Sequence, residues 1–335
     1  MLLFIYEHLC GGLAIMPGAE SLRREGRAML AALLDDFAAC PGVRVVTLLS
    51  PALPAPSGVL VERGGTDSLQ AFARLAETAD VTLVVAPEFD GVLERLCRTV
   101  EAKGGGLLGP SAEAVRLTGD KLALGHHLRA HGIPTPPSFE WPARELPPPL
   151  VCKPRDGAGS QATFLIADDR QRADAARQAA VEGWTGPLIG QPFIDGVAVS
   201  VAVLIGPKQR LALPAAEQHQ SRDGRFRYLG GRLPLPDALD RRARELAEAA
   251  LRAVEGLTGY VGVDLVLGKT AADDAVIEIN PRVTTSYVGL RALAEFNLAE
   301  VWLNLVLERA PGECPWRSET VVFRADGTVI KGESS

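Results

Sequence analysis

The chain has 335 residues, of which 47% are hydrophobic and 23% are charged, and its net charge is −6 at neutral pH. Since single cores stop growing near roughly 250 to 300 residues, we expect two or three domains. The composition excludes collagen-like, disordered and disulfide-scaffold proteins. Negative charge without a long basic run argues against nucleic acid or an anionic membrane as the main partner.

The five cysteines are scattered and form no C-x-x-C pair, which indicates reduced thiols rather than disulfides or a zinc site. The apolar N-terminal run LLFIY stops at Glu7 and lacks the basic flank and cleavage site of a signal peptide. No apolar run reaches the roughly 18 to 20 residues that cross a bilayer. We therefore expect a cytoplasmic protein.

The first hundred residues alternate apolar runs with helical patterns. The runs LLFIY, VRVVTLL, VLVE and VTLVVA are separated by expected helices, which is typical of a parallel sheet wrapped by helices. Continuous runs such as VTLVVA fit strands buried on both faces. Functional groups of such sheets lie at the carboxyl ends of the strands, which here are Glu7 to Gly12, Ser50 and Glu88 to Gly91.

The pattern changes after LLGPS. A helix is expected over Asp120 to Ala130, and the stiff IPTPPSFEWP then indicates a domain junction. The alternating run VAVSVAVLIG predicts an antiparallel strand. Further on, VGVDLVLG and AVIEINPR predict two strands joined by a polar turn.

Two lysines need an explanation in a chain that uses mainly arginine for its positive charge. Lys153 lies in the apolar strand pattern PLVCKP, where an unpaired lysine is costly to bury. Lys121 lies in the first turn of a helix, where a cation gains nothing from the helix dipole. An anion bound between them explains both positions, although a solvated surface charge is the alternative for either one alone.

A glycine-bearing loop, RDGAGSQ, follows Lys153 directly. Its backbone N–H groups could close around phosphate oxygens. It lacks the Gly-Lys-Ser/Thr of a P-loop, and an ordinary hairpin turn remains the alternative. The loop residues that we assign to phosphate binding are Gly157, Ala158, Gly159 and Ser160.

Polar residues alternate with apolar ones in VIEINPRVTTSY. Glu278 and Asn280 are two positions apart and face one side of a strand, so Ile277 and Ile279 should pack on the other side. A hairpin would bring Asp264, in the preceding strand, beside the pair. Two carboxylates and an amide oxygen suit Mg²⁺ held with nucleotide phosphates. The solvent face of an edge hairpin is the alternative.

Arg282 follows two positions beyond Asn280 and should point to the same place. Its fixed fork of N–H donors suits a transferring phosphoryl group or a developing oxyanion. Whether the next polar residues, Thr285 and Ser286 among them, touch a substrate stays open.

Taken in this order, these elements resemble the ATP-grasp superfamily of carboxylate–amine ligases. The resemblance implies an α/β plus α+β fold, in which a Rossmann-like pre-ATP-grasp domain (1–115) precedes an ATP-grasp fold. Two α+β subdomains would then clasp ATP, a small one with the phosphate loop (116–195) and a C-terminal one with the metal site (196–335). Activity would be that of an ADP-forming C–N ligase that works through an acyl phosphate.

The resemblance also implies roles for single residues. Lys121 and Lys153 match the lysines that contact ATP phosphates, with Lys153 and Arg282 as catalytic residues. The adenine-binding hinge matches Gln191, Pro192, Phe193 and Ile194, and the ligands of Mg²⁺, or of Mn²⁺ in its place, match Asp264, Glu278 and Asn280. Two departures stand out: GVAVSV lacks the ribose-binding carboxylate, and Gly262 replaces an arginine found in several amino-acid ligases.

Within this superfamily, the chain looks most like the branch that contains tyramine–glutamate ligase, an enzyme that helps to make methanofuran, which is a cofactor of one-carbon metabolism. The segments that carry this likeness are YEHLCGG, SLRREGRAML, AEQ followed by YLGG, and EINPRVTTSYVGL. This implies a γ-carboxylate donor and a small amine as substrates. We expect neither nucleic acid nor a membrane as a partner. A homodimer is one assembly that we expect. The candidate substrate contacts are Glu7, Gly11, Gly12, Arg225, Tyr228, Thr285 and Ser286. Further cations for an acidic substrate are Arg222, Arg227 and Arg291.

Three other functions compete with this interpretation. A bicarbonate-activating enzyme similar to biotin carboxylase is disfavoured by the lack of a biotin-carrier segment. An ATP-binding module without turnover predicts nucleotide binding but no ADP release. An N-terminal dinucleotide-binding oxidoreductase domain is disfavoured because CGG, rather than G-x-G-x-x-G, follows the first strand.

Overall fold

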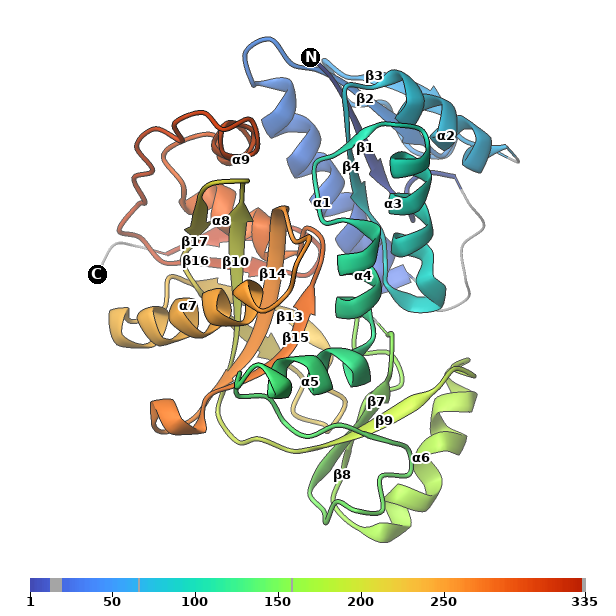
Figure 1. Ribbon diagram of the computed structural model, residues 1–335, viewed down its shortest axis with the longest axis vertical. Helices are drawn as coiled ribbons and strands as arrows, with labels where there is room; N and C mark the ends of the chain where they lie inside the picture. The colour runs from blue at the N-terminus through green and yellow to red at the C-terminus, as the bar shows by residue number, and fades with distance from the viewer. Residues whose placement is uncertain (13–19, 66, 158, 333–335) are drawn as a thin grey trace.

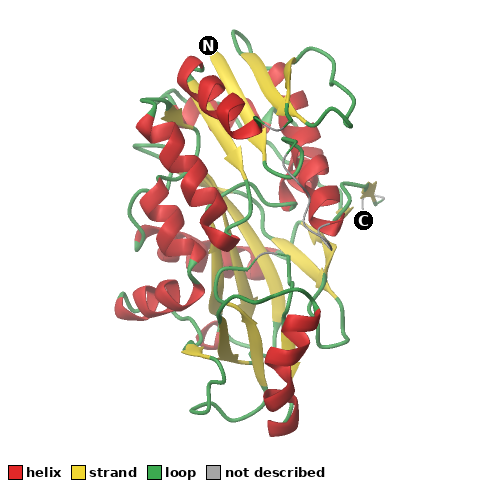
Figure 2. Cartoon of the chain, turned by 90° about the vertical axis from the view of Figure 1, so that its right-hand side faces the viewer, coloured by secondary structure: helices red, strands yellow, loops and turns green. Residues whose placement is uncertain are grey.

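The computed structural model describes residues 1–12, 20–65, 67–157 and 159–332. In this part of the chain the strands form a five-stranded, a four-stranded and an eight-stranded sheet. Figure 1 shows the five-stranded sheet beside the N-terminus at the top, the four-stranded sheet at the bottom and the eight-stranded sheet between them. Figure 2 shows that helices lie along the outside of the strands.

The N-terminal sheet is parallel throughout, as the sequence predicts. Its order is β3-β2-β1-β4-β5. On β1, Leu3 and Ile5 pack into one core while Phe4 and Tyr6 pack into another, so this strand is buried on both faces. The elements of this part are β1 (Leu2–Glu7), α1 (Glu20–Ala38), β2 (Arg44–Leu49), β3 (Leu60–Arg63), α2 (Ser68–Thr78), β4 (Val81–Val85), the 3₁₀ helix η1 (Phe89–Gly91), α3 (Val92–Ala102) and β5 (Gly106–Leu107).

The four-stranded sheet is antiparallel, in the order β6-β9-β7-β8. Its strands have one face on helix α6, where Leu150 and Cys152 join a small core. The alternate residues Val151 and Lys153 therefore face the opposite side. The elements are β6 (Phe139–Glu140), β7 (Leu150–Pro154), β8 (Phe164–Ile166), α6 (Asp169–Val181) and β9 (Leu188–Pro192).

The eight-stranded sheet is also antiparallel, and its central strands β10 and β14 are covered on both faces. Helix α7 packs on one face, and α8 and α9 lie on the other. The sheet follows the order β15-β14-β10-β12-β13-β16-β17, with β11 paired to β10. The elements are β10 (Val197–Ile205), β11 (Arg210–Ala212), β12 (Ala216–Gln220), β13 (Tyr228–Leu233), α7 (Asp237–Arg252), β14 (Gly259–Leu267), η2 (Ala271–Asp273), β15 (Ala275–Asn280), α8 (Ser286–Leu293), α9 (Leu298–Val306), β16 (Val321–Arg324) and β17 (Val329–Lys331).

Helices α4 (Ala112–Gly119) and α5 (Lys121–Ala130) pack on this large sheet. Leu124 and Leu128, four residues apart on one face of α5, join the same core as Val199 of β10. The sequence grouped residues from 116 onward with the small subdomain, and that boundary does not match the packing. The change of sequence pattern near residue 116 does not show that the helices after it pack on the core of the large sheet.

The N-terminal part and the large sheet share a core. Phe37 of α1 packs on Trp302 of α9, with 5.5 Å between the ring centroids. Asp36 accepts a hydrogen bond from the Tyr287 hydroxyl at 2.8 Å and pairs with Arg291 at 2.6 Å. These contacts join α1 firmly to α8 and α9.

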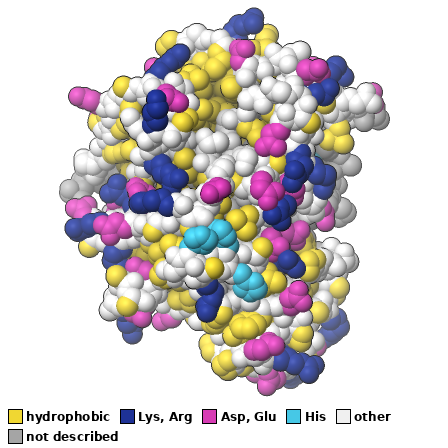
Figure 3. Space-filling view, in the orientation of Figure 1, with side chains coloured by type: hydrophobic (Ala, Val, Ile, Leu, Met, Phe, Trp, Pro, Cys, Tyr) yellow, Lys and Arg dark blue, Asp and Glu magenta, His cyan; other side chains and the backbone are white. Residues whose placement is uncertain are grey.

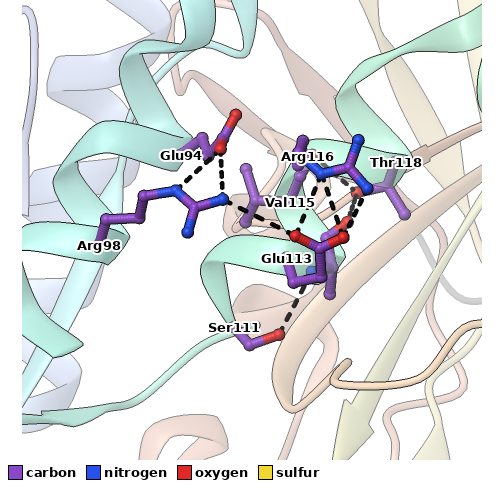
Figure 4. A network of polar contacts seen from close by, with 8 residues as sticks. Glu94, Arg98, Ser111, Glu113, Val115, Arg116 and Thr118 are labelled. Atoms are coloured by element: carbon purple, nitrogen blue, oxygen red, sulfur yellow. Dashed lines mark hydrogen bonds and ion pairs between the residues drawn. The ribbon is translucent and has the colours of Figure 1, made fainter.

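The outer surface carries mixed charges. On the face shown in Figure 3, basic and acidic side chains are interspersed. Figure 4 shows one such network, in which Arg98 of α3 bonds Glu94 at 2.8 Å and lies 3.7 Å from Glu113 of α4, which also pairs with Arg116. Among the described residues no helix is both long and apolar enough to cross a membrane.

Candidate active site

A cavity of about 690 Å³ lies between the four-stranded and the eight-stranded sheets. Strands β7 and β9 line it from one side, and β12, β14 and β15 line it from the other. This volume falls within the range of roughly 300 to 1,000 Å³ that small-molecule and cofactor sites occupy. The cavity is large enough for a nucleotide.

One end of the cavity is formed by the end of β9 and the start of the segment that joins it to β10. Gln191, Pro192, Phe193 and Ile194 all line it. Buried Gln191 donates a side-chain hydrogen bond to Ser138 at 2.8 Å, which fixes the end of β9. The ring of Phe193 lies 6.2 Å from that of Phe226, so this end is apolar on two sides and suits a flat aromatic base.

The two lysines project into the cavity from different elements. Lys121 begins α5, donates to the Gly157 carbonyl at 2.6 Å and lies 3.3 Å from a carboxylate oxygen of Glu278. Lys153 on β7 is only 7% exposed, and its ammonium forms no ion pair with any residue that the structure describes. Burial lowers the pKa of Lys153 to about 8, against the opposite effect of Glu278. A buried and unpaired cation favours an anionic ligand.

The glycine-bearing loop lies along the same cavity. Gly157, Gly159 and Ser160 line it, whereas Ala158 lies outside the described residues. Ser160 donates to the Phe226 carbonyl at 2.7 Å, which ties the loop to the large sheet. Gly159 has φ of 68°, and a Cβ there would lie 2.5 Å from Leu22 of α1. Both the backbone angle and the close packing require glycine at this position.

Asp264 and Glu278 face each other across the β14–β15 hairpin. Asp264 accepts hydrogen bonds from Gln218 at 2.9 Å and from Asn280 at 3.0 Å. Burial and the neighbouring Glu278 raise the pKa of Asp264. Burial also acts on Glu278, but the Lys121 and Lys153 ammonium groups hold the pKa of Glu278 well below its usual range.

This donor set fits a hard divalent cation. Two half-buried carboxylates this close repel each other, and a cation between them would relieve that repulsion. No group of three or more His, Cys, Asp and Glu side chains that could hold a metal occurs in the described parts of the chain. A metal here would therefore need the Asn280 carbonyl oxygen or phosphate oxygens as further ligands, which suits Mg²⁺.

One detail of the predicted strand is wrong. Asp264 pairs with Glu278, but Leu265 pairs with Val276, so Ile277 is the extra residue of a β-bulge. Ile277 therefore lines the cavity together with Glu278, while Ile279 is buried in the core behind the sheet. The simple alternation of two faces breaks at this bulge.

Arg282 follows β15, two residues of which line the cavity, but it is not itself among the lining residues and is held by the N-terminal part. Its Nε and Nη2 groups donate to the two carboxylate oxygens of Glu88 at 2.8 and 3.1 Å. Burial disfavours the charged form, but Glu88 keeps the pKa of Arg282 above its usual value. Glu278 and Glu25 also act on this guanidinium.

Three of the predicted substrate contacts lie in the N-terminal part and have packing roles. Glu7 is fully buried, accepts a hydrogen bond from the Cys10 N–H at 2.8 Å and packs against Gly26. A Cβ at Gly11 would lie 2.4 Å from the Tyr6 ring, and Gly12 has φ of 92° against Gly64. None of the three belongs to the cavity wall.

The other predicted contacts lie in the large C-terminal part of the chain. Arg225 pairs with Glu182 and lies 4.2 Å from the centroid of the Phe164 ring, so it contacts two residues of the small subdomain. Tyr228 is half-buried on β13, and burial with nearby Asp264 and Glu25 raises its pKa. Arg291 is paired with Asp36, away from the cavity.

Thr285 and Ser286 are both buried. Thr285 donates to Glu25 of α1 at 3.2 Å. Ser286 shares hydrogen bonds with Tyr260 at 3.2 Å and with Thr284 at 2.8 Å.

The sequence did not single out Glu25 or Gln218, and it included Glu88 only within a strand-end segment. Gln218 could have been noticed from the alternation in AEQHQ, which points it to the same face as Gln220. Glu25 lies on a helix with several charged residues, and nothing in that pattern distinguishes it.

Comparison with known proteins places this geometry in context. Residues 118–286 match the family model described as ATP-grasp domain, and residues 43–115 match the pre ATP-grasp 3 domain. The tyramine–L-glutamate ligase of Methanocaldococcus fervens is 28% identical over 251 residues, which cover 75% of this chain and 71% of the relative. That of Methanocaldococcus jannaschii is 30% identical over 216 residues, 64% of this chain but only 60% of the relative. A crystal structure of an ATP-grasp superfamily protein from Archaeoglobus fulgidus is 26% identical, with a TM-score of 0.73 over 96% of this chain and 92% of that one.

Proposed function

The chain belongs to the ATP-grasp family, and on that premise we propose that it is an ATP-dependent carboxylate–amine ligase that releases ADP. The observation that carries the proposal is the buried Lys153, which forms no ion pair with any described residue and shares one cavity with Lys121 and the Asp264–Glu278 pair. Two cations and two carboxylates that line one cavity suit a polyphosphate with its metal.

ATP would lie along the cavity with its base against Gln191 to Ile194 and its phosphates at Lys121, Lys153 and the 157–160 loop. Asp264, Glu278 and the carbonyl oxygen of Asn280 would hold Mg²⁺, with Mn²⁺ as an alternative ion. When bound, the metal neutralises phosphate charge and polarises the γ-phosphorus.

The chemistry would proceed in two displacements. A carboxylate oxygen of the donor attacks the γ-phosphorus, and the bond to the β-phosphate oxygen breaks to release ADP. The amine then attacks the carbonyl carbon of the acyl phosphate, loses a proton and expels inorganic phosphate. Lys153 and Arg282 stabilise the phosphoryl group in the first step, and Arg282 also donates to the oxyanion in the second.

For substrates we propose L-glutamate, through its γ-carboxylate, and tyramine or a similar small amine. The support is the similarity to two tyramine–L-glutamate ligases. In this proposal the product enters the biosynthesis of a methanofuran-type cofactor.

ADP release from MgATP, L-glutamate and tyramine tests this proposal. Without either substrate, release should fall to background. Glu278→Gln and Arg282→Ala should lower the rate by at least about 100-fold, in the range for lost transition-state contacts. Glu145→Gln, at an exposed position that does not line the cavity, is the control and should keep the wild-type rate.

Two results would count against the proposal. If no carboxylate and amine pair raises ADP release, the chain is a nucleotide-binding module rather than a ligase. If bicarbonate alone supports full turnover, the bicarbonate-activating alternative holds instead.

A further inference from the structure

The ion pair between Glu88 and Arg282 joins residues that lie 194 positions apart. Their side chains are 7% and 15% exposed, and both carboxylate oxygens are engaged. Paired charges with little access to water are costly unless their geometry is good, and two parallel N–H···O bonds provide it. The contact is therefore well ordered rather than a loose surface pair.

Glu88 has a fixed place in the N-terminal part. It follows β4 at the carboxyl end of the parallel sheet and directly precedes η1. Gly119, the last residue of α4, packs against it, since a Cβ there would lie 3.4 Å from the Glu88 Cβ. Glu88 is itself buried, so packing against its neighbours holds it in place.

Counting donors shows what the pair leaves available on Arg282. A guanidinium carries five N–H groups. Within the described residues, three of them are used: Nε and Nη2 bond Glu88, and Nη1 bonds the Val283 carbonyl at 3.3 Å. Since Nη1 and Nη2 each carry two hydrogens, one N–H remains on each. Two free donors on one guanidinium suit two oxygens of a phosphoryl group.

Other carboxylates compete for the same guanidinium. Glu25 and Glu278 both act on its charge. Glu7 lies close enough for Arg282 to act on it in turn. If Glu88 were neutral, the guanidinium could turn toward one of these groups and use its two free donors there.

We propose that Glu88 is a positioning residue that orients Arg282, so that its two remaining N–H groups face the phosphoryl group in transfer. The N-terminal domain then contributes to the chemical step through a residue that touches neither ATP nor substrate. This inference rests on the proposed function, because it assigns Arg282 to the transferring group.

Binding of aluminium fluoride to the MgADP-loaded protein tests this role without any carboxylate or amine, because aluminium fluoride imitates a phosphoryl group in transfer. Glu88→Gln keeps the size of the side chain but loses its charge. This variant should bind aluminium fluoride at least about 10-fold more weakly by calorimetric titration, while its Kd for MgADP stays within about two-fold of the wild-type value. Glu88→Asp keeps the charge and should recover part of the loss.

Asp36→Asn is the matched control. It breaks another ion pair between the same two parts of the molecule, Asp36 with Arg291, at a distance from the cavity. It should lower the melting temperature yet bind aluminium fluoride as the wild-type protein does. If Glu88 only held the two parts of the molecule together, Asp36→Asn and Glu88→Gln would both weaken aluminium fluoride binding.

The outcomes separate this inference from the proposed function. Aluminium fluoride binding by Glu88→Gln at the wild-type affinity would overturn the positioning role. Unchanged binding by Arg282→Ala would remove the assignment of Arg282 itself. Loss of binding in both variants supports the role of Glu88, even if every carboxylate and amine pair fails to give ADP.

Discussion

At the scale of single residues, Glu7 is a carboxyl group that the fold holds away from water. Burial is the main cause that raises its pKa, to about 7 from an ordinary value of 4.5, while its hydrogen bond from Cys10 acts in the opposite direction. Because the folded state binds this proton more tightly than the unfolded state, the group stabilises the fold below about pH 4.5. That contribution is lost as the pH rises through 7.

Glu7→Gln should remove this pH dependence, because the amide has the same shape and never ionises. The variant should gain about 1 to 3 kcal/mol of unfolding free energy relative to wild type between pH 5 and pH 8. Urea denaturation at both pH values measures this difference. Glu145→Gln is the exposed control, and a difference for Glu7→Gln that does not change with pH would contradict the argument.

At the scale of elements, the glycine-bearing loop that follows β7 is held by a contact with the N-terminal part. Gly159 combines a positive φ with the Leu22 side chain directly above it. The loop conformation therefore depends on helix α1 as well as on the flanking strands β7 and β8.

Gly159→Ala should displace the loop and raise the KM for ATP about 10-fold or more, and the unfolding free energy should fall by about 1 kcal/mol. Trimming the neighbour in Gly159→Ala/Leu22→Ala removes the clash but leaves the positive φ. The double variant should recover part of the KM change, which steady-state kinetics would show. If it recovers nothing, backbone strain alone accounts for the effect.

The elements also show how far the sequence could predict the site. Alternation in VIEINPR and a hairpin were sufficient to predict that Glu278 and Asn280 lie beside Asp264. The bulge at Ile277 could not be predicted, because it depends on how two strands with no fixed register close their turn. The partner of Arg282 could not be predicted either, since no local pattern connects it to Glu88 across 194 positions.

At the scale of the whole molecule, the α/β and α+β parts that the sequence predicts are all present, but the domains are less separate than it suggested. One hydrophobic core includes Leu3 and Phe37 from the N-terminal part together with Tyr287 and Trp302 from the C-terminal part. The four-stranded sheet instead has a core of its own. Amphipathic patterns predict that a face is buried but not which neighbour buries it.

The shared core predicts that the N-terminal part and the eight-stranded sheet unfold together. Phe37→Ala should cost about 3 to 5 kcal/mol, because it leaves a cavity beside Trp302. Calorimetry should show one unfolding transition for both parts, with a lower midpoint temperature than in the wild-type protein. Two separate transitions, only one of which moves, would show that the parts are independent.

The central claim is that this chain activates a carboxylate as an acyl phosphate. The most direct measurement follows ¹⁸O from the γ-carboxylate of labelled L-glutamate during turnover with MgATP and tyramine, with the inorganic phosphate analysed by mass spectrometry. Our account predicts one ¹⁸O atom in each phosphate released, because the carboxylate oxygen that attacks the γ-phosphorus leaves with it. Phosphate without the label, formed together with the amide, would contradict the account.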